Sequence, residues 1–110
     1  MTNLSQRVGF GVEKARAATT FNGSFLNIGT GLDHAPAVIV FDNQTDVAVP
    51  LSVNGADIWK TFSPGEAFVL DLRANHGIAS NYAIDVGTQF STNASVGTTG
   101  SFRISYVYAR

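Results

Sequence analysis

The chain has 110 residues, of which 45% are hydrophobic and 14% charged, and a formal net charge of −1. This length and composition indicate one folded domain with a single core and exclude a disordered chain. Because the sequence has no cysteine, disulfides, thiol nucleophiles and thiolate metal sites are excluded.

The N-terminal segment, residues 1–24, differs from the rest of the chain in charge. It carries three cations and one carboxylate, whereas residues 25–110 carry four cations and seven carboxylates. Such a basic segment can dock on the acidic body of a neighbouring copy or contact nucleic acid. Three cations without interleaved aromatic residues are few for nucleic-acid binding, so we do not expect nucleic acid as a partner. The segment lacks the apolar stretch of a signal peptide.

The side-chain pattern of this segment predicts an extended arm. Val8, Phe10 and Val12 alternate with glycines, which is typical of a short strand or an extended segment. Residues 13–18 have helix propensity for a single turn, which is too short to be stable alone. We therefore predict an N-terminal arm on a β-domain formed by residues 25–110. The arm is either a flexible tail or a strand that pairs with a sheet edge of another subunit.

After the arm, apolar runs alternate with turn signals. One strand is predicted over residues 25–30 and another over residues 37–41, which follow Pro36 because proline keeps the residue before it out of the helical region. The second run is continuously apolar, as expected for a central strand covered on both faces. The polar residues 42–46 form its turn.

Residues 47–53 alternate as in a strand with one buried face. Pro50 has no N–H to donate to a neighbouring strand, so this strand lies at a sheet edge or carries a bulge. Asn54-Gly55 then tolerates positive φ and predicts a tight hairpin turn. The buried face of the strand carries Val47, Val49, Leu51 and Val53.

Two further strands follow over residues 58–62 and 67–72, separated by the turn residues Ser63-Pro64-Gly65. The first contains the one tryptophan of the chain, Trp59. In the second, Phe68, Leu70 and Leu72 share one face, and Val69 and Asp71 share the other.

The C-terminal third contains one weak and one strong strand pattern. Residues 82–90 are the weak pattern, and a polar loop over residues 91–100 separates them from residues 101–109. In the last run Phe102, Ile104, Tyr106 and Tyr108 share one face, and we expect the first three in the core with Ile39 and Phe41. The chain is therefore predicted to be all-β, a single antiparallel β-sandwich or jelly-roll-like barrel of about 7–8 short strands with an extended N-terminal arm.

No pattern of reactive side chains predicts catalysis or a bound metal or cofactor. His34 and His76 have no metal-ligand spacing, and no GxSxG nucleophile turn is present. The carboxylates lie mostly beside turns, where aspartate commonly serves turn formation. An alternative function is a carbohydrate-binding β-sandwich, in which Trp59 and Tyr82 would form a stacking platform for a sugar.

Several turn and strand-end residues between positions 37 and 110 resemble a pattern in small structural proteins of tailed-bacteriophage virions. The matching residues are Asn54-Gly55, Trp59, Pro64-Gly65, Asp71-Leu72, Asn75, Gly87-Thr88, Gly100-Ser101, Tyr106 and Tyr108. The resemblance implies a non-enzymatic virion protein that oligomerises and binds the capsid, neck or tail, with capsid decoration as the favoured role. It also implies other virion proteins as partners (major capsid, portal or neck, or tail), assembly in the virion, and synthesis in the cytoplasm of a bacterial host.

For such a protein the interface residues are expected in the arm, at the strand that contains proline and at the tryptophan. No membrane partner is expected, because no apolar run approaches the ~18 residues of a spanning helix. The predicted interface residues are Arg7, Val8, Phe10, Val12, Lys14, Arg16, Pro50 and Trp59.

Overall fold

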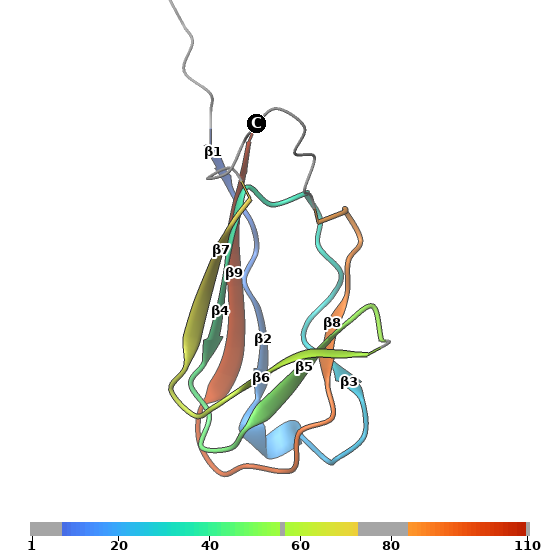
Figure 1. The fold of residues 1–110 in the computed structure, drawn as a ribbon, viewed down its shortest axis with the longest axis vertical. Helices are drawn as coiled ribbons and strands as arrows, with labels where there is room; N and C mark the ends of the chain where they lie inside the picture. Colours follow the sequence, from blue (N-terminus) through green and yellow to red (C-terminus); the bar gives the residue numbers. More distant parts are fainter. Residues whose placement is uncertain (1–7, 56, 73–83, 110) are drawn as a thin grey trace, which may run out of the picture.

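The computed structural model describes residues 8–55, 57–72 and 84–109, and the described residues contain nine strands and one short 3-10 helix. The prediction of an all-β fold is confirmed, and Figure 1 shows the strands in two facing layers. The elements are β1 (Val8–Phe10), β2 (Lys14–Ala17), η1 (Ala18–Thr20), β3 (Leu26–Asn27), β4 (Val38–Asn43), β5 (Val49–Val53), β6 (Ile58–Phe62), β7 (Ala67–Asp71), β8 (Phe90–Thr92) and β9 (Ser101–Ala109).

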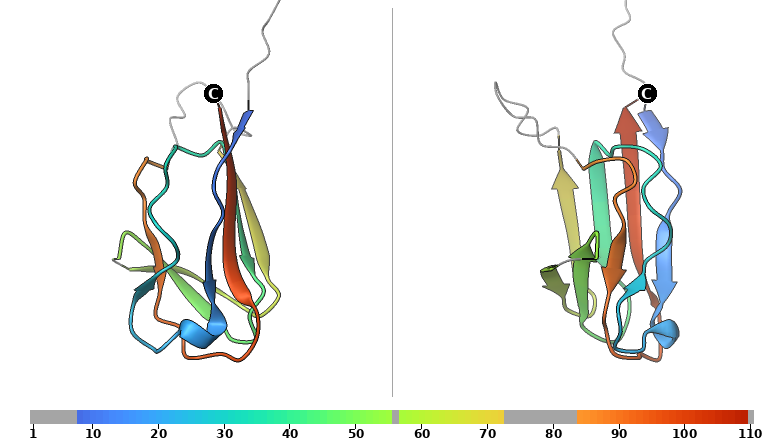
Figure 2. Two further views of the ribbon diagram at one scale, coloured as in Figure 1. Left: turned by 180° about the vertical axis from the view of Figure 1, so that it is seen from behind. Right: turned by 90° about the vertical axis from the view of Figure 1, so that its right-hand side faces the viewer.

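The strands pair in a nested order. β2 pairs with β9, β3 with β8, β4 with β7 and β5 with β6, all antiparallel. Pairing of β4 with β9 and of β5 with β8 joins these pairs into two sheets. Sheet A has the order β1-β9-β4-β7, with β2 also beside β9, and sheet B has the order β3-β8-β5-β6. The sheets pack face to face (Figure 2), so the predicted β-sandwich is confirmed, with the chain path of a jelly roll.

Part of the N-terminal segment lies in sheet A as β1 and β2, where the sequence predicted a separate arm over residues 1–24. β1 and β2 both pair with β9, and the register shifts by one residue between them, as in a β-bulge. Ala18 and Phe21 are buried in the core. Residues 8–24 are therefore built into the sandwich, and the strand β2 replaces the predicted helical turn. Residues 1–7 lie outside the described residues.

Two tyrosines of β9 explain the glycines in this edge segment of sheet A. A Cβ atom at Gly9 would overlap the ring of Tyr108, and one at Gly11 would overlap the ring of Tyr106. The backbone N–H of Gly11 also donates to the Tyr106 carbonyl oxygen at 2.9 Å. The glycines leave room for both aromatic rings, so the alternation of glycine with apolar residues indicates an edge strand beside aromatic partners.

The turns form largely where the sequence predicted them. Asn54 and Gly55 both have positive φ, 58° and 73°, as the hairpin between β5 and β6 requires. Gly65, with φ of 83°, closes the next turn. The strand with Pro50 is not at an edge, because β5 lies between β6 and β8. The alternative prediction, a bulge, is confirmed by a register shift between Leu51 and Ser52.

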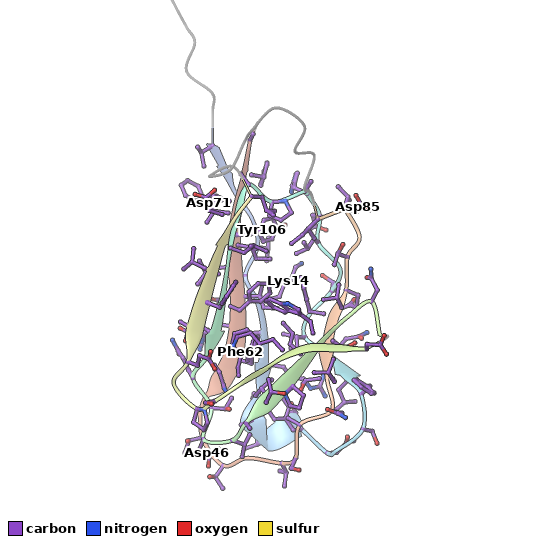
Figure 3. The ribbon with its side chains drawn as sticks, viewed as in Figure 1. Lys14, Asp46, Phe62, Asp71, Asp85 and Tyr106 are labelled. Carbon is purple, nitrogen blue, oxygen red and sulfur yellow. The ribbon has the colours of Figure 1, made fainter. Side chains whose placement is uncertain are left out.

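The core lies between the sheets and is rich in aromatic residues. Phe62 packs edge-on against Phe102, with ring centroids 5.3 Å apart, and Phe41 packs edge-on against Phe90 at 5.3 Å. Figure 3 shows Phe62 and Tyr106 between the two layers. The predicted core residues are all buried: Ile39, Phe41, Phe102, Ile104 and Tyr106.

Candidate interaction surface

The outer face of sheet A, turned away from the core, carries a continuous group of apolar side chains. Burial alternates along β4, so Ile39 and Phe41 point into the core while Val38 and Val40 point outward. The cross-strand register places Val69 of β7 beside Val40 and Val107 of β9 beside Val38, and Phe10 of β1 lies beside Val107 on the far side of β9. We call this group the valine face, which consists of Val8, Phe10, Val38, Val40, Val69, Val107 and Ala109.

Three side chains of the valine face are strongly exposed: Phe10 at 80%, Val69 at 61% and Val8 at 54%. The outer face of an antiparallel sheet usually carries polar side chains, because water covers it. Large contiguous exposed apolar patches are typical of interaction sites, which makes this face the candidate interaction surface. The prediction that residues 37–41 are covered on both faces is wrong for the described part of one chain, in which only the inner face is covered.

A hollow of about 240 Å³ lies in the valine face. Phe10 and Glu13 line it from the N-terminal strand, and Val38, Val40 and Val107 line it from the centre of the sheet. Most of the lining is hydrocarbon, so the hollow favours an apolar side chain over a charged one.

Polar side chains border the valine face on the side of Arg103. The Arg103 Nη1 atom lies 2.9 Å from Glu13 Oε1, and the Ser105 hydroxyl donates to Glu13 Oε2 at 3.4 Å. On the neighbouring strand, Gln44 Nε2 donates to Asp42 Oδ2 at 2.6 Å. An apolar centre with a polar border is the usual composition of a protein–protein interface.

Of the predicted interface residues, the apolar ones of the N-terminal segment are on the surface. Val8 and Phe10 belong to the valine face, and Val12 is 67% exposed at the bulge between β1 and β2. Pro50 is half-buried in β5. Arg7 lies outside the described residues.

Two of the three basic residues of this set make hydrogen bonds within the chain. Lys14 is only 4% exposed, and its Nζ donates to Thr30 Oγ1 at 2.8 Å (Figure 3). Arg16 Nη1 donates to the Asn27 carbonyl oxygen at 3.1 Å. Both residues thus hold β2 to the segment around β3.

Trp59 is 44% exposed and packs on aromatic side chains of its own chain. Its ring centroid lies 5.4 Å from that of Phe41, 6.0 Å from Phe62 and 5.6 Å from Phe68. The proposed sugar platform also needs Tyr82, which lies outside the described residues. The sugar-binding alternative therefore stays a prediction.

The remaining candidate residues for chemistry do not assemble into a reactive site within the described part of the chain. His34 stacks on Tyr108, with ring centroids 3.7 Å apart and planes at 3°, while His76 lies outside the described residues. No group of three or more histidine, aspartate or glutamate side chains among the described residues is placed to hold a metal ion. No described helix is long and apolar enough to cross a membrane.

Sequence reasoning missed five members of the valine face: Val38, Val40, Val69, Val107 and Ala109. For the first two, a continuous apolar run does not tell which side chains face the core. For Val69 and Val107, the sequence did assign a face opposite the core residues. The sequence feature that could have identified this face is the presence of β-branched apolar residues at outward positions of three neighbouring strands, β4, β7 and β9.

Comparison with known proteins adds no relative to this chain. No family model matches it, no curated protein matches it, and no solved structure matches it.

Proposed function

We propose that this chain is a non-enzymatic structural component of a tailed-bacteriophage virion. In this role it oligomerises and binds the capsid, neck or tail, and decoration of the capsid is the favoured position. Its partners would be further copies of itself and other virion proteins, and it would be made in the bacterial cytoplasm before joining the virion. The proposal starts from the sequence resemblance, whose residues include the turns Asn54-Gly55 and Pro64-Gly65.

The observation that carries the proposal is the valine face. Covering an exposed valine or phenylalanine side chain contributes about 1.5–3 kcal/mol relative to leaving it in water. Val8, Phe10 and Val69, the most exposed members, would together offset several kcal/mol of the roughly 4–15 kcal/mol lost on association. The valine face alone does not supply enough free energy for a tight contact between two molecules. In a lattice the same face is present in every copy, so many weak contacts act together.

The role of the resembling residues is consistent with a protein that works through its surface. Gly55 and Gly65 take positive φ in tight turns, and Trp59 packs on neighbouring aromatic rings. These residues shape strands and hairpins, and none of the described ones forms part of a reactive cluster. The fold itself does not decide the function, because jelly rolls occur in capsid proteins, lectins and enzymes.

The test compares two lysine substitutions at valines of nearly equal exposure. Val69 on the valine face is 61% exposed and Val96 in the loop before β9 is 63% exposed. We expect Val69→Lys to reduce the solution mass measured by light scattering and to abolish co-sedimentation with capsids that lack the protein. Val96→Lys should leave both unchanged. Equal capsid binding by both variants would contradict the valine face as the interface, and a wild-type monomer that never sediments with capsids would contradict the proposed role.

A further inference from the structure

A second hollow lies between the two sheets, on the side of β6 and β7, and is distinct from the valine face. Its volume is about 180 Å³. Both layers contribute to it, and Trp59 gives it a partly exposed wall. The residues that line it are Phe41, Val53, Trp59, Leu70, Ile84 and Phe90.

The side chains that line this hollow are hydrocarbon, apart from the indole N–H of Trp59. A sugar or another polar ligand would lose its hydrogen bonds to water there without replacement, which is strongly unfavourable. The hollow therefore does not suit the carbohydrate that the alternative function would bind. Trp59 nevertheless lines this hollow and is also part of the predicted sugar platform.

The aromatic walls favour a flat ring over a flexible chain. The rings of Phe41 and Trp59 are 5.4 Å apart and tilted by 59°, and those of Phe41 and Phe90 are 5.3 Å apart and inclined by 75°. Because these rings are inclined to one another, a ring placed between them meets aromatic surfaces in more than one orientation. A further aromatic ring can then pack edge-to-face on one wall and offset-stacked on another, the two favoured arrangements of aromatic pairs.

The size of the hollow fits one ring. An apolar cavity of roughly 150 Å³ in another protein stays free of water and binds benzene. An unfilled apolar space also forfeits the dispersion contacts that its lining side chains would make. A ligand that restores these contacts is favoured without any new polar interaction.

We propose that this hollow is a binding site for a small apolar ligand with a single aromatic ring, or for such a ring at the end of a larger ligand. The site involves none of the residues of the valine face, so it is independent of the proposed role in assembly. Val53 and Ile84 would contact the ring through their methyl groups, and Trp59 would cover its outer side.

Trp59 makes the test direct, because it is the one tryptophan in the chain. The full chain is titrated with toluene up to the solubility limit, and Trp59 fluorescence and the melting temperature are recorded. We expect a saturable fluorescence change and, at ten times the dissociation constant, a rise of roughly 5 °C in melting temperature. Glucose at the same concentrations should change neither quantity.

Two phenylalanine substitutions locate the site. Val53→Phe fills the hollow and should weaken toluene binding at least tenfold, whereas Val69→Phe, on the opposite face of β7 from Leu70, should leave it unchanged. If Val53→Phe does not fold, nuclear Overhauser contacts from toluene to the methyl groups of Val53 and Leu70 in the wild-type chain replace it. No saturable response to toluene, an undiminished response of Val53→Phe, or contacts confined to other methyl groups would each overturn the proposal.

Discussion

Asn43, at the end of β4, offers the sharpest test of how this jelly roll is held together. Its side chain is fully buried. The amide Nδ2 lies 3.0 Å from the carbonyl oxygens of Val47 and Phe62 and 3.1 Å from that of Ser63. Its Oδ1 accepts from the backbone N–H of Thr45 at 3.0 Å and from the Thr45 hydroxyl at 2.6 Å. One amide thus joins the end of sheet A to the residues that enter and leave the β5–β6 hairpin.

Replacing Asn43 with alanine should destabilise the protein by about 3–4 kcal/mol. Two buried groups, the Phe62 carbonyl and the Thr45 N–H, lose their side-chain partner, and each such loss costs about 1–3 kcal/mol. The Thr45 hydroxyl can turn to the Val47 carbonyl oxygen, 3.0 Å away, so it adds little. Urea unfolding at pH 7 measures the change, provided that the slope with denaturant stays that of the wild type.

Asn43→Asp separates the donor role of this residue from its acceptor role. A carboxylate keeps the acceptor for Thr45 but places a second negative oxygen against the carbonyls of Val47, Phe62 and Ser63. It should therefore be more destabilising than alanine at pH 7 and should recover relative to wild type when acid protonates it. Asn22→Ala is the control, because Asn22 is exposed and accepts one bond in a turn, from Ser24. A loss below about 1 kcal/mol for Asn43→Ala, or a more stable Asn43→Asp at pH 7, would refute the reasoning.

Three other changes test separate parts of the structure. Phe102→Ala should cost about 3–5 kcal/mol in urea unfolding, because its ring is fully buried, and a cost below about 1 kcal/mol would contradict its place in the core. Gly100→Ala should lower the melting temperature strongly, because φ is 79° and a Cβ would overlap the Gln44 carbonyl oxygen; an unchanged melting temperature would contradict this contact. Hydrogen bonds from the Thr98 hydroxyl and the Thr98 and Thr99 N–H groups lower the pKa of Asp46 from 3.8 to about 2. This carboxylate therefore stabilises the fold above pH 4, and its contribution is lost as the pH falls from 4 to 2. Asp46→Asn should flatten the stability profile in that interval, and an identical profile for both proteins would contradict the assignment.

The core and the hairpin turns were predictable because each has a local cause. In β9 every second residue from Phe102 is apolar and large, and the strand buries that side. Asn54-Gly55 tolerates the positive φ that a tight hairpin needs, wherever the rest of the chain lies. Such signals do not depend on distant residues, so sequence reasoning finds them.

The N-terminal segment could not be predicted because its cause is distant in sequence. Residues 8–17 are extended by pairing with β9, and Gly9 and Gly11 fit beneath tyrosines almost a hundred positions away. Judged by propensity alone, residues 13–18 suit a helical turn. The ladder with β9 overrides that preference, since backbone pairing and the buried side chains of Lys14 and Ala18 stabilise β2 and the short helix η1 after it.

The candidate interaction surface was predicted only in part for a related reason. Val8 and Phe10 were expected at an interface because they lie in a segment with an unusual composition. Val38 and Val40 were expected to be covered, which is also the state that the proposed assembly would give them. The sequence thus indicates that these apolar side chains are buried, but it does not tell whether the same chain or another molecule buries them.

The nested pairing of the strands also has a consequence for how the protein is made. Val8 pairs with Ala109, so sheet A joins residues from the two ends of the described chain, and β9 forms the bridge between β1, β2 and β4. During synthesis the first strands emerge long before their partner exists. Among the described strands, β5 and β6 are the only two that are consecutive in sequence and also pair with each other. Loops this long close slowly. Sheet A should therefore form only after β9 has been synthesised, and until then its earlier apolar strands are exposed on the nascent chain.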